Sequence, residues 1–123
     1  MTMPDAAESF RTTLADELRA AFAARDHDAI RTLRCVMAAV DNAGALSQAA
    51  SAQYAAASIT EVPRRRLDQQ EIAALLQAEI AARSRTVEIY ARTGNTAHAT
   101  QLAAEITTIE RLATRLDASP APK

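Results

Sequence analysis

One segment of this sequence carries both a start signal and a stop signal for a helix, and so restricts what the chain can form. Asp68 is a suitable N-cap, and Glu71, three residues later, completes the pattern of a capping box. Gly94 supplies the left-handed residue that commonly ends a helix. The pattern predicts a helix over about 68–91, followed by a tight turn.

Three other segments have apolar residues at every third or fourth position, which is typical of helices with one buried face. They predict helices over about 5–24, 28–40 and 96–116. Residues 41–46 are a weak stop signal. Residues 47–58 have helix propensity but no apolar face, so either a frayed extension of the helix or a mobile segment is expected there. The residues expected on the buried faces include Phe10, Leu14, Leu18 and Phe22 in the first helix, and Ile30, Leu33, Met37 and Val40, with Val36 beside them, in the second.

Composition argues against a sheet protein, because aromatic residues make up only 3% of the chain and there are only two glycines. The 123 residues are enough for one domain with a modest core. The sequence therefore predicts an all-α, four-helix domain over 5–117 with a disordered tail over 118–123.

Arg83 interrupts the apolar face of the helix over 68–91. At 100° per residue, Arg83 falls inside the arc of apolar side chains and Glu79 falls on its edge. Glu105 falls inside the apolar arc of the last helix. If the two helices form an antiparallel hairpin about Gly94, facing residues have numbers that add up to about 188, which pairs Arg83 with Glu105.

Two interpretations of these three charged residues remain open. In the structural one, Glu79, Arg83 and Glu105 form a half-buried ion network that fixes the register of the hairpin. In the functional one, the two carboxylates form a catalytic or ligand-binding pair. A carboxylate tied to an arginine is stabilised in its ionised form, which favours the structural interpretation.

No other cluster of residues suggests catalysis. His27 and His98 have no second His or Cys at ligand spacing, so no metal site is expected, and both are expected to be exposed. Cys35 is expected to be a small core residue. The sequence contains no glycine-rich phosphate loop and no nucleophile motif, so no catalytic residue and no cofactor are predicted.

Arginine clusters are the remaining signal. Arg31 and Arg34 lie near the start of the second helix, and Arg64, Arg65 and Arg66 precede the third. Arginines can bind the phosphates of RNA. The alternative is a set of solvated arginines balanced by nearby acids. The net charge of −1 and the absence of an aromatic stacking platform in the sequence favour that alternative.

The sequence resembles the GatB/YqeY family over about residues 10–113. "LADELRAAFAARDHDAI" is similar to that family's first helix and turn, and Thr32–Arg34 with Ala38, Ala39 and Asn42 to its second helix. Glu79, Arg83, Tyr90 and Gly94 lie in the stretch similar to its third helix. "LAAEITTIERL" is similar to its fourth helix.

The resemblance implies a non-catalytic helical module accessory to a tRNA-dependent amidotransferase. Possible partners are tRNA or an amidotransferase-like complex. Members of the family normally continue into a second helical domain associated with tRNA contact, and this sequence stops at Lys123. The alternative is therefore a protein–protein interaction module without RNA binding. The first residues resemble no signal peptide and no apolar run is long enough to span a membrane, so a cytoplasmic location is expected.

Overall fold

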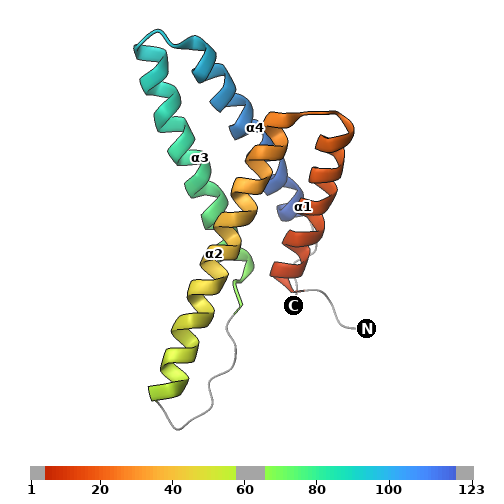
Figure 1. Cartoon of the computed structure of the whole chain (residues 1–123), viewed down its shortest axis with the longest axis vertical. Helices are drawn as coiled ribbons and strands as arrows, with labels where there is room; N and C mark the ends of the chain where they lie inside the picture. The colour runs from red at the N-terminus through yellow and green to blue at the C-terminus, as the bar shows by residue number, and fades with distance from the viewer. Residues whose placement is uncertain (1–4, 58–65, 119–123) are drawn as a thin grey trace.

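The computed structural model of the chain describes residues 5–57 and 66–118, which contain four α-helices and no strand (Figure 1). The prediction of an all-α fold is confirmed. Ala118, predicted to begin the tail, is still helical, and residues 119–123 lie outside the described part. The helices are α1 (Ala6–Ala23), α2 (His27–Ala57), α3 (Gln69–Arg92) and α4 (Thr96–Ala118).

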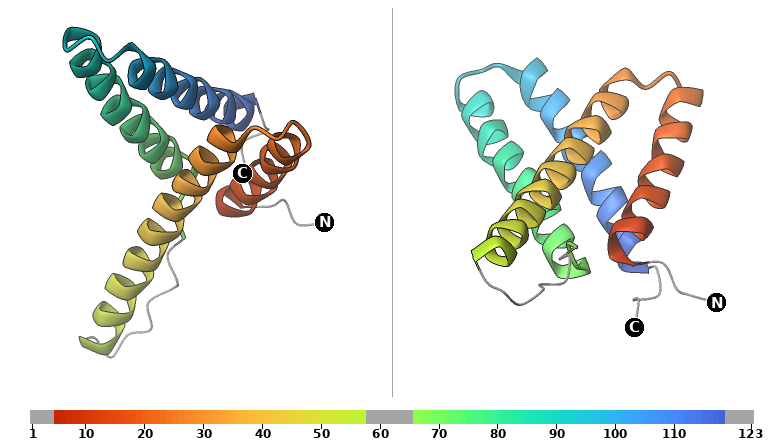
Figure 2. Two further views of the ribbon diagram at one scale, coloured as in Figure 1. Left: turned by 45° about the horizontal axis from the view of Figure 1, so that its top comes forward. Right: turned by 60° about the horizontal axis from the view of Figure 1, so that its bottom comes forward.

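The apolar core lies where all four helices meet, at one end of the α3–α4 hairpin. The buried residues of α3 are Ile72 and Leu76, and those of α4 are Ile109 and Leu112. Beyond this core, α3 and α4 continue as a two-helix arm (Figures 1 and 2). The largest fully buried side chains of the core are Phe10, Leu33, Val36, Leu76, Ile109 and Leu112.

The ends of the hairpin follow the signals in the sequence. The Asp68 carboxylate accepts from the backbone N–H of Glu71 at 2.8 Å, and the Glu71 side chain accepts from the N–H of Asp68 at 3.3 Å. At the other end Gly94 has φ +80°. The N–H of Asn95 donates to the carbonyl of Tyr90 at 2.9 Å, as in a Schellman motif. These contacts place α4 antiparallel to α3.

The turn between α1 and α2 is also a Schellman motif, but its left-handed residue is Arg25, with φ 56°. The N–H of Arg25 donates to the carbonyl of Phe22 at 3.1 Å, and that of Asp26 to the carbonyl of Ala21 at 2.9 Å. The Asp26 carboxylate then accepts from the N–H of Ala29 at 3.1 Å and begins α2. Arginine rarely adopts this conformation, because its Cβ crowds the backbone.

Helix α2 has 31 residues and continues through the predicted stop at 41–46. The predicted stop is wrong, whereas the expected extension of the helix beyond it is present as far as Ala57. A glycine inside a helix costs only about 1 kcal/mol relative to alanine, and Gly44 is flanked by alanines. The second half of α2 runs past the other helices (Figures 1 and 2). Leu46, on this part of the helix, is 65% exposed.

Three predictions about buried side chains are wrong. Phe22 is 52% exposed and Met37 is 36% exposed, and Cys35 lies on the surface. Helix α2 instead buries a face that includes Leu33 and Val36. Cys35 lies two residues beyond Leu33, about 160° away around the helix, so it faces away from the core.

Candidate functional site

Arg83 lies between two carboxylates on the α3–α4 arm. Its Nε donates to Oε1 of Glu105 at 2.9 Å, which joins the two helices. Its Nη1 lies 3.4 Å from Oε1 of Glu79, one turn earlier on α3, and 3.2 Å from the carbonyl oxygen of the same residue. The side chains of Arg83 and Glu105 are 14% and 15% exposed. The pairing follows the register expected for the hairpin.

Electrostatics keep the guanidinium of this network charged. Burial acts to lower the pKa of Arg83, but the hydrogen bond to Glu105 and the negative charges of Glu79 and Glu105 outweigh it, so the pKa is raised. Two carboxylates share one cation, which gives the cluster a net charge of −1. An ionised pair of this kind is suited to joining α3 to α4, although its role stays a prediction.

Of the five arginines predicted to bind RNA, the three that the structure describes do not form one patch. Arg31 and Arg34 lie near the start of α2, next to the C-terminal end of α1, whereas Arg66 lies at the N-terminal end of α1. The 18 residues of α1 separate these two groups by roughly 27 Å, at about 1.5 Å per helical residue. Arg64 and Arg65 lie outside the described residues.

Arg66 joins the start of α3 to the start of α1. Its Nη1 lies 2.7 Å from Oδ2 of Asp5 and 3.9 Å from Oε1 of Glu8. The pKa of Asp5 is lowered, first by the hydrogen bond from the N–H of Glu8 and further by Arg66. Arg66 therefore already has carboxylate partners, which would compete with a phosphate.

Arg34 is placed differently from Arg66. Its Cζ lies over the ring of Phe22, 5.6 Å from the ring centroid. This distance falls within the range of a cation–π contact. The neighbouring Arg31 is hydrogen-bonded to Asp28, one turn before it on α2. One surface of the α1–α2 end thus holds an exposed aromatic ring with a guanidinium over it.

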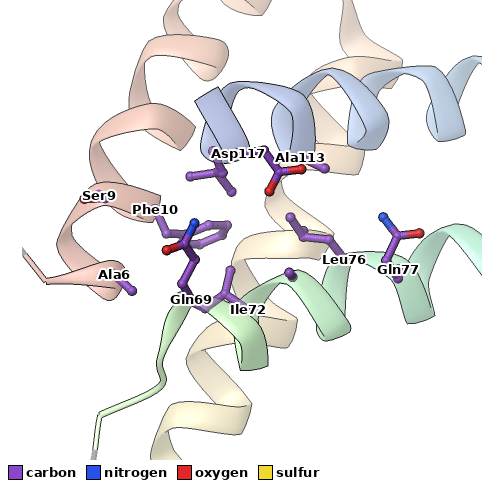
Figure 3. A pocket seen from close by; sticks show the side chains of 11 residues that line it. Ala6, Ser9, Phe10, Gln69, Ile72, Leu76, Gln77, Ala113 and Asp117 are labelled. Carbon is purple, nitrogen blue, oxygen red and sulfur yellow. The ribbon is translucent and has the colours of Figure 1, made fainter. Parts of the chain in front are cut away.

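A small pocket opens between the N-terminal ends of α1 and α3 and the C-terminal end of α4 (Figure 3). Phe10, Ile72 and Leu76 give it an apolar floor, and the polar groups of Gln69 and Asp117 lie at its edge. Its volume is about 60 Å³. An apolar cavity of about 150 Å³ can take up benzene, so a volume of about 60 Å³ is too small to enclose a nucleotide or a cofactor.

No group of three or more metal-ligating side chains occurs within residues 5–57 and 66–118. His98 stacks on Tyr90 at 5.0 Å between ring centroids, and its Nδ1 lies 3.0 Å from Oδ1 of Asn95. Both His27 and His98 are exposed. None of the described helices is both long enough and apolar enough to cross a membrane.

Comparison with family models, with curated proteins and with solved structures found no match. The resemblance to the GatB/YqeY family therefore stays a prediction. A proposal about function therefore has to rest on the contacts and exposure of this chain's own residues.

The sequence patterns did not predict the exposure of Phe22 or the left-handed conformation of Arg25, both at the α1–α2 end. Phe22 follows Phe10, Leu14 and Leu18 at a spacing of four and was therefore expected in the core. Arg25 was expected only as part of a polar turn. A signal was present for Arg25, since the turn 25–28 contains no glycine and a left-handed residue had to come from a larger side chain. The exposure of Phe22 depends instead on where the neighbouring helices lie.

Proposed function

We propose that this chain is a non-catalytic helical module of the GatB/YqeY kind, accessory to a tRNA-dependent amidotransferase in the cytoplasm. The observation that carries the proposal is the α3–α4 arm. Glu79, Arg83, Tyr90 and Gly94, which lie in the stretch that resembles the family's third helix, each have a definite place there. The first two form the ion network, Tyr90 stacks on His98, and Gly94 makes the turn.

Binding to tRNA in this proposal is electrostatic and involves the arginines predicted from the sequence. Among the three of them that the structure describes, Arg34 is the most accessible to phosphate, because its contact is a ring and not a carboxylate. Arg31 and Arg66 contribute less, since each is held by an acidic residue. The two ends of α1 therefore contribute unequally to tRNA binding, and the end next to α2 contributes more.

An electrophoretic shift with total tRNA over a series of salt concentrations tests the proposal. We expect the logarithm of the binding constant to fall linearly with the logarithm of salt. Arg34→Gln should reduce that slope by about one unit, the loss of one phosphate contact, and Arg66→Gln should reduce it less. Arg111→Gln, an exposed arginine on α4, is the control. Absence of a shift at low salt contradicts tRNA binding.

The expected lack of catalytic activity is tested separately. The purified chain should release neither ammonia from glutamine nor phosphate from ATP. Turnover by protein free of contaminating enzymes contradicts the non-catalytic part of the proposal and leaves the RNA part standing.

An interaction module without RNA binding is the second candidate, and the exposed Leu46 favours it. This side chain is 65% exposed in the second half of α2. A protein partner that covers it would be lost from a pull-down with Leu46→Glu. This candidate is preferred if that loss occurs and no tRNA shift is found at any salt concentration.

A further inference from the structure

The exposed ring at the α1–α2 end is unusual for this chain. The sequence contains two phenylalanines, and the other one, Phe10, is 1% exposed in the core. Phe22 is 52% exposed and lies under the guanidinium of Arg34. A protein with so few aromatic residues thus keeps a large ring at the surface, in contact with a cation.

The segment 19–34, which carries this ring, is positively charged, although the chain as a whole has a net charge of −1. Residues 19–34 contain four arginines and two aspartates, a net charge of +2. Arg31 is paired with Asp28 and Arg19 with Asp16, which also contacts Arg115. Neither Arg25 nor Arg34 has a carboxylate partner among the described residues.

Arg25 adds a second, independent observation. It occupies the left-handed position of the turn, where glycine is least strained and where a non-glycine residue costs about 1–2 kcal/mol. The side chain starts three residues after Phe22, in the turn that follows α1. The chain therefore accepts backbone strain to keep an exposed arginine in the turn that follows Phe22.

We propose that Phe22 and Arg34 form a stacking platform for an unpaired RNA nucleotide, and that the charges of Arg34 and of Arg25, in the adjoining turn, hold its flanking phosphates. The proposal rests on the proposed function, and names a single-stranded part of the tRNA as the segment that is bound. Unpaired bases stack on aromatic rings and on the planes of arginine guanidinium groups, whereas bases inside a duplex are covered by their neighbours.

Charge and shape together favour RNA over a protein partner at this site. A single ring offers little apolar area, and protein interfaces usually need a larger buried patch. Cations beside an aromatic ring match instead the alternation of phosphate and base along a single strand. The platform is sequence-tolerant, because every base has a flat face.

Fluorescence anisotropy of the full chain with a labelled, unstructured RNA of about ten nucleotides tests this, since that length spans one stacking site and its flanking phosphates. A blunt RNA duplex of equal length is the comparison. We expect tighter binding to the single strand. Phe22→Leu keeps an apolar side chain and removes the ring, and should weaken single-strand binding by about tenfold, within the range measured for one stacked base.

Two matched controls separate the platform from the rest of the surface. Ile89 is also 52% exposed, but lies on α3, so Ile89→Ala should leave binding unchanged. Arg85, an exposed arginine on α3, is the control for Arg34, since Arg34→Gln should weaken binding and Arg85→Gln should not. Phe22→Leu should leave the salt slope unchanged, whereas Arg34→Gln should reduce it by about 0.7, the value for one phosphate of a single strand. Circular dichroism checks that each variant is folded.

Equal affinity for single strand and duplex, or full binding by Phe22→Leu, overturns the platform. If total tRNA still binds in that case, the proposed function stands and only the platform fails. If neither tRNA nor the single strand binds, both proposals fail. Binding of the single strand through Phe22 without a shift of tRNA supports the platform and contradicts the tRNA function.

Discussion

The guanidinium of Arg83 lies 2.9 Å from Glu105 across the α3–α4 hairpin and 3.4 Å from Glu79 on its own helix. The three side chains are between 14% and 30% exposed, so water screens them only in part. One cation offsets two carboxylates. The loss of Arg83 should therefore cost more stability than the loss of either acid.

Arg83→Ala should lower the free energy of unfolding by about 2 kcal/mol, because it leaves two half-buried carboxylates without a cation. Removing one partner of a fully buried pair typically costs about 3–5 kcal/mol, and partial exposure reduces that cost. Urea denaturation followed by circular dichroism measures the change. The control is Arg111→Ala, at an exposed position of α4, which should change stability by less than about 0.5 kcal/mol.

The double substitution Arg83→Met with Glu105→Leu should recover most of the loss, since matched apolar groups have no charge to desolvate. A double-mutant cycle then gives the coupling between the two residues. A coupling near zero would contradict a structural role for the network. A fully stable double variant that no longer binds its partner would point to the functional interpretation.

Substitution by alanine should change the stability of the chain in opposite directions at Gly94 and at Gly44. Gly94→Ala places a Cβ at φ +80° and should destabilise the chain by about 1 kcal/mol. Gly44 lies inside α2, and an added Cβ there meets nothing within 4 Å. Gly44→Ala should therefore stabilise the chain by about 0.5–1 kcal/mol. Thermal unfolding of both variants is the test, and a change of the same sign in both would contradict it.

Helix α3 and its charged pair could be predicted from the sequence because their signals are local or depend on a single turn. The capping box of Asp68 and the left-handed Gly94 both fix ends of α3, and a short turn then sets the register that pairs Arg83 with Glu105. The signals at the two ends of α3 involve residues close in sequence, and Arg83 and Glu105, 22 residues apart, are brought together by the one short turn between them. The packing of α1 and α2 did not have to be known.

The exposure of Phe22 could not be predicted from the spacing of four residues that joins it to Phe10, Leu14 and Leu18. Residues four apart advance about 40° around a helix, so Phe22 lies roughly 120° from Phe10 after three such steps. Whether that position is buried depends on where the neighbouring helices lie. A similar dependence explains α2, where the other helices cover Val36 and leave Met37 partly exposed.

Stability at low pH should depend on Asp5. Its folded-state pKa is lowered below the ordinary value of 3.8, so it stabilises the fold above that value. This stabilisation should be lost as the pH falls through the folded pKa. Asp5→Asn should keep the N-cap and remove this part of the pH dependence, because asparagine caps helices about as well. Urea unfolding of both proteins from about pH 5 to pH 2 measures it. Parallel stability curves over that range would contradict the assignment.

Arg25→Gly should make the chain more stable and its RNA binding weaker. Glycine adopts φ 56° without crowding from a Cβ, and the gain should be about 1 kcal/mol in the free energy of unfolding. Arg19→Gly is the matched control: the same change inside α1 should destabilise by about 1 kcal/mol. If Arg25 holds a phosphate beside Phe22, the more stable variant should also show a smaller salt slope with single-stranded RNA. A gain in stability with unchanged RNA binding would remove Arg25 from the platform, and a loss of stability would show that the arginine side chain makes a contact worth more than the strain of its backbone.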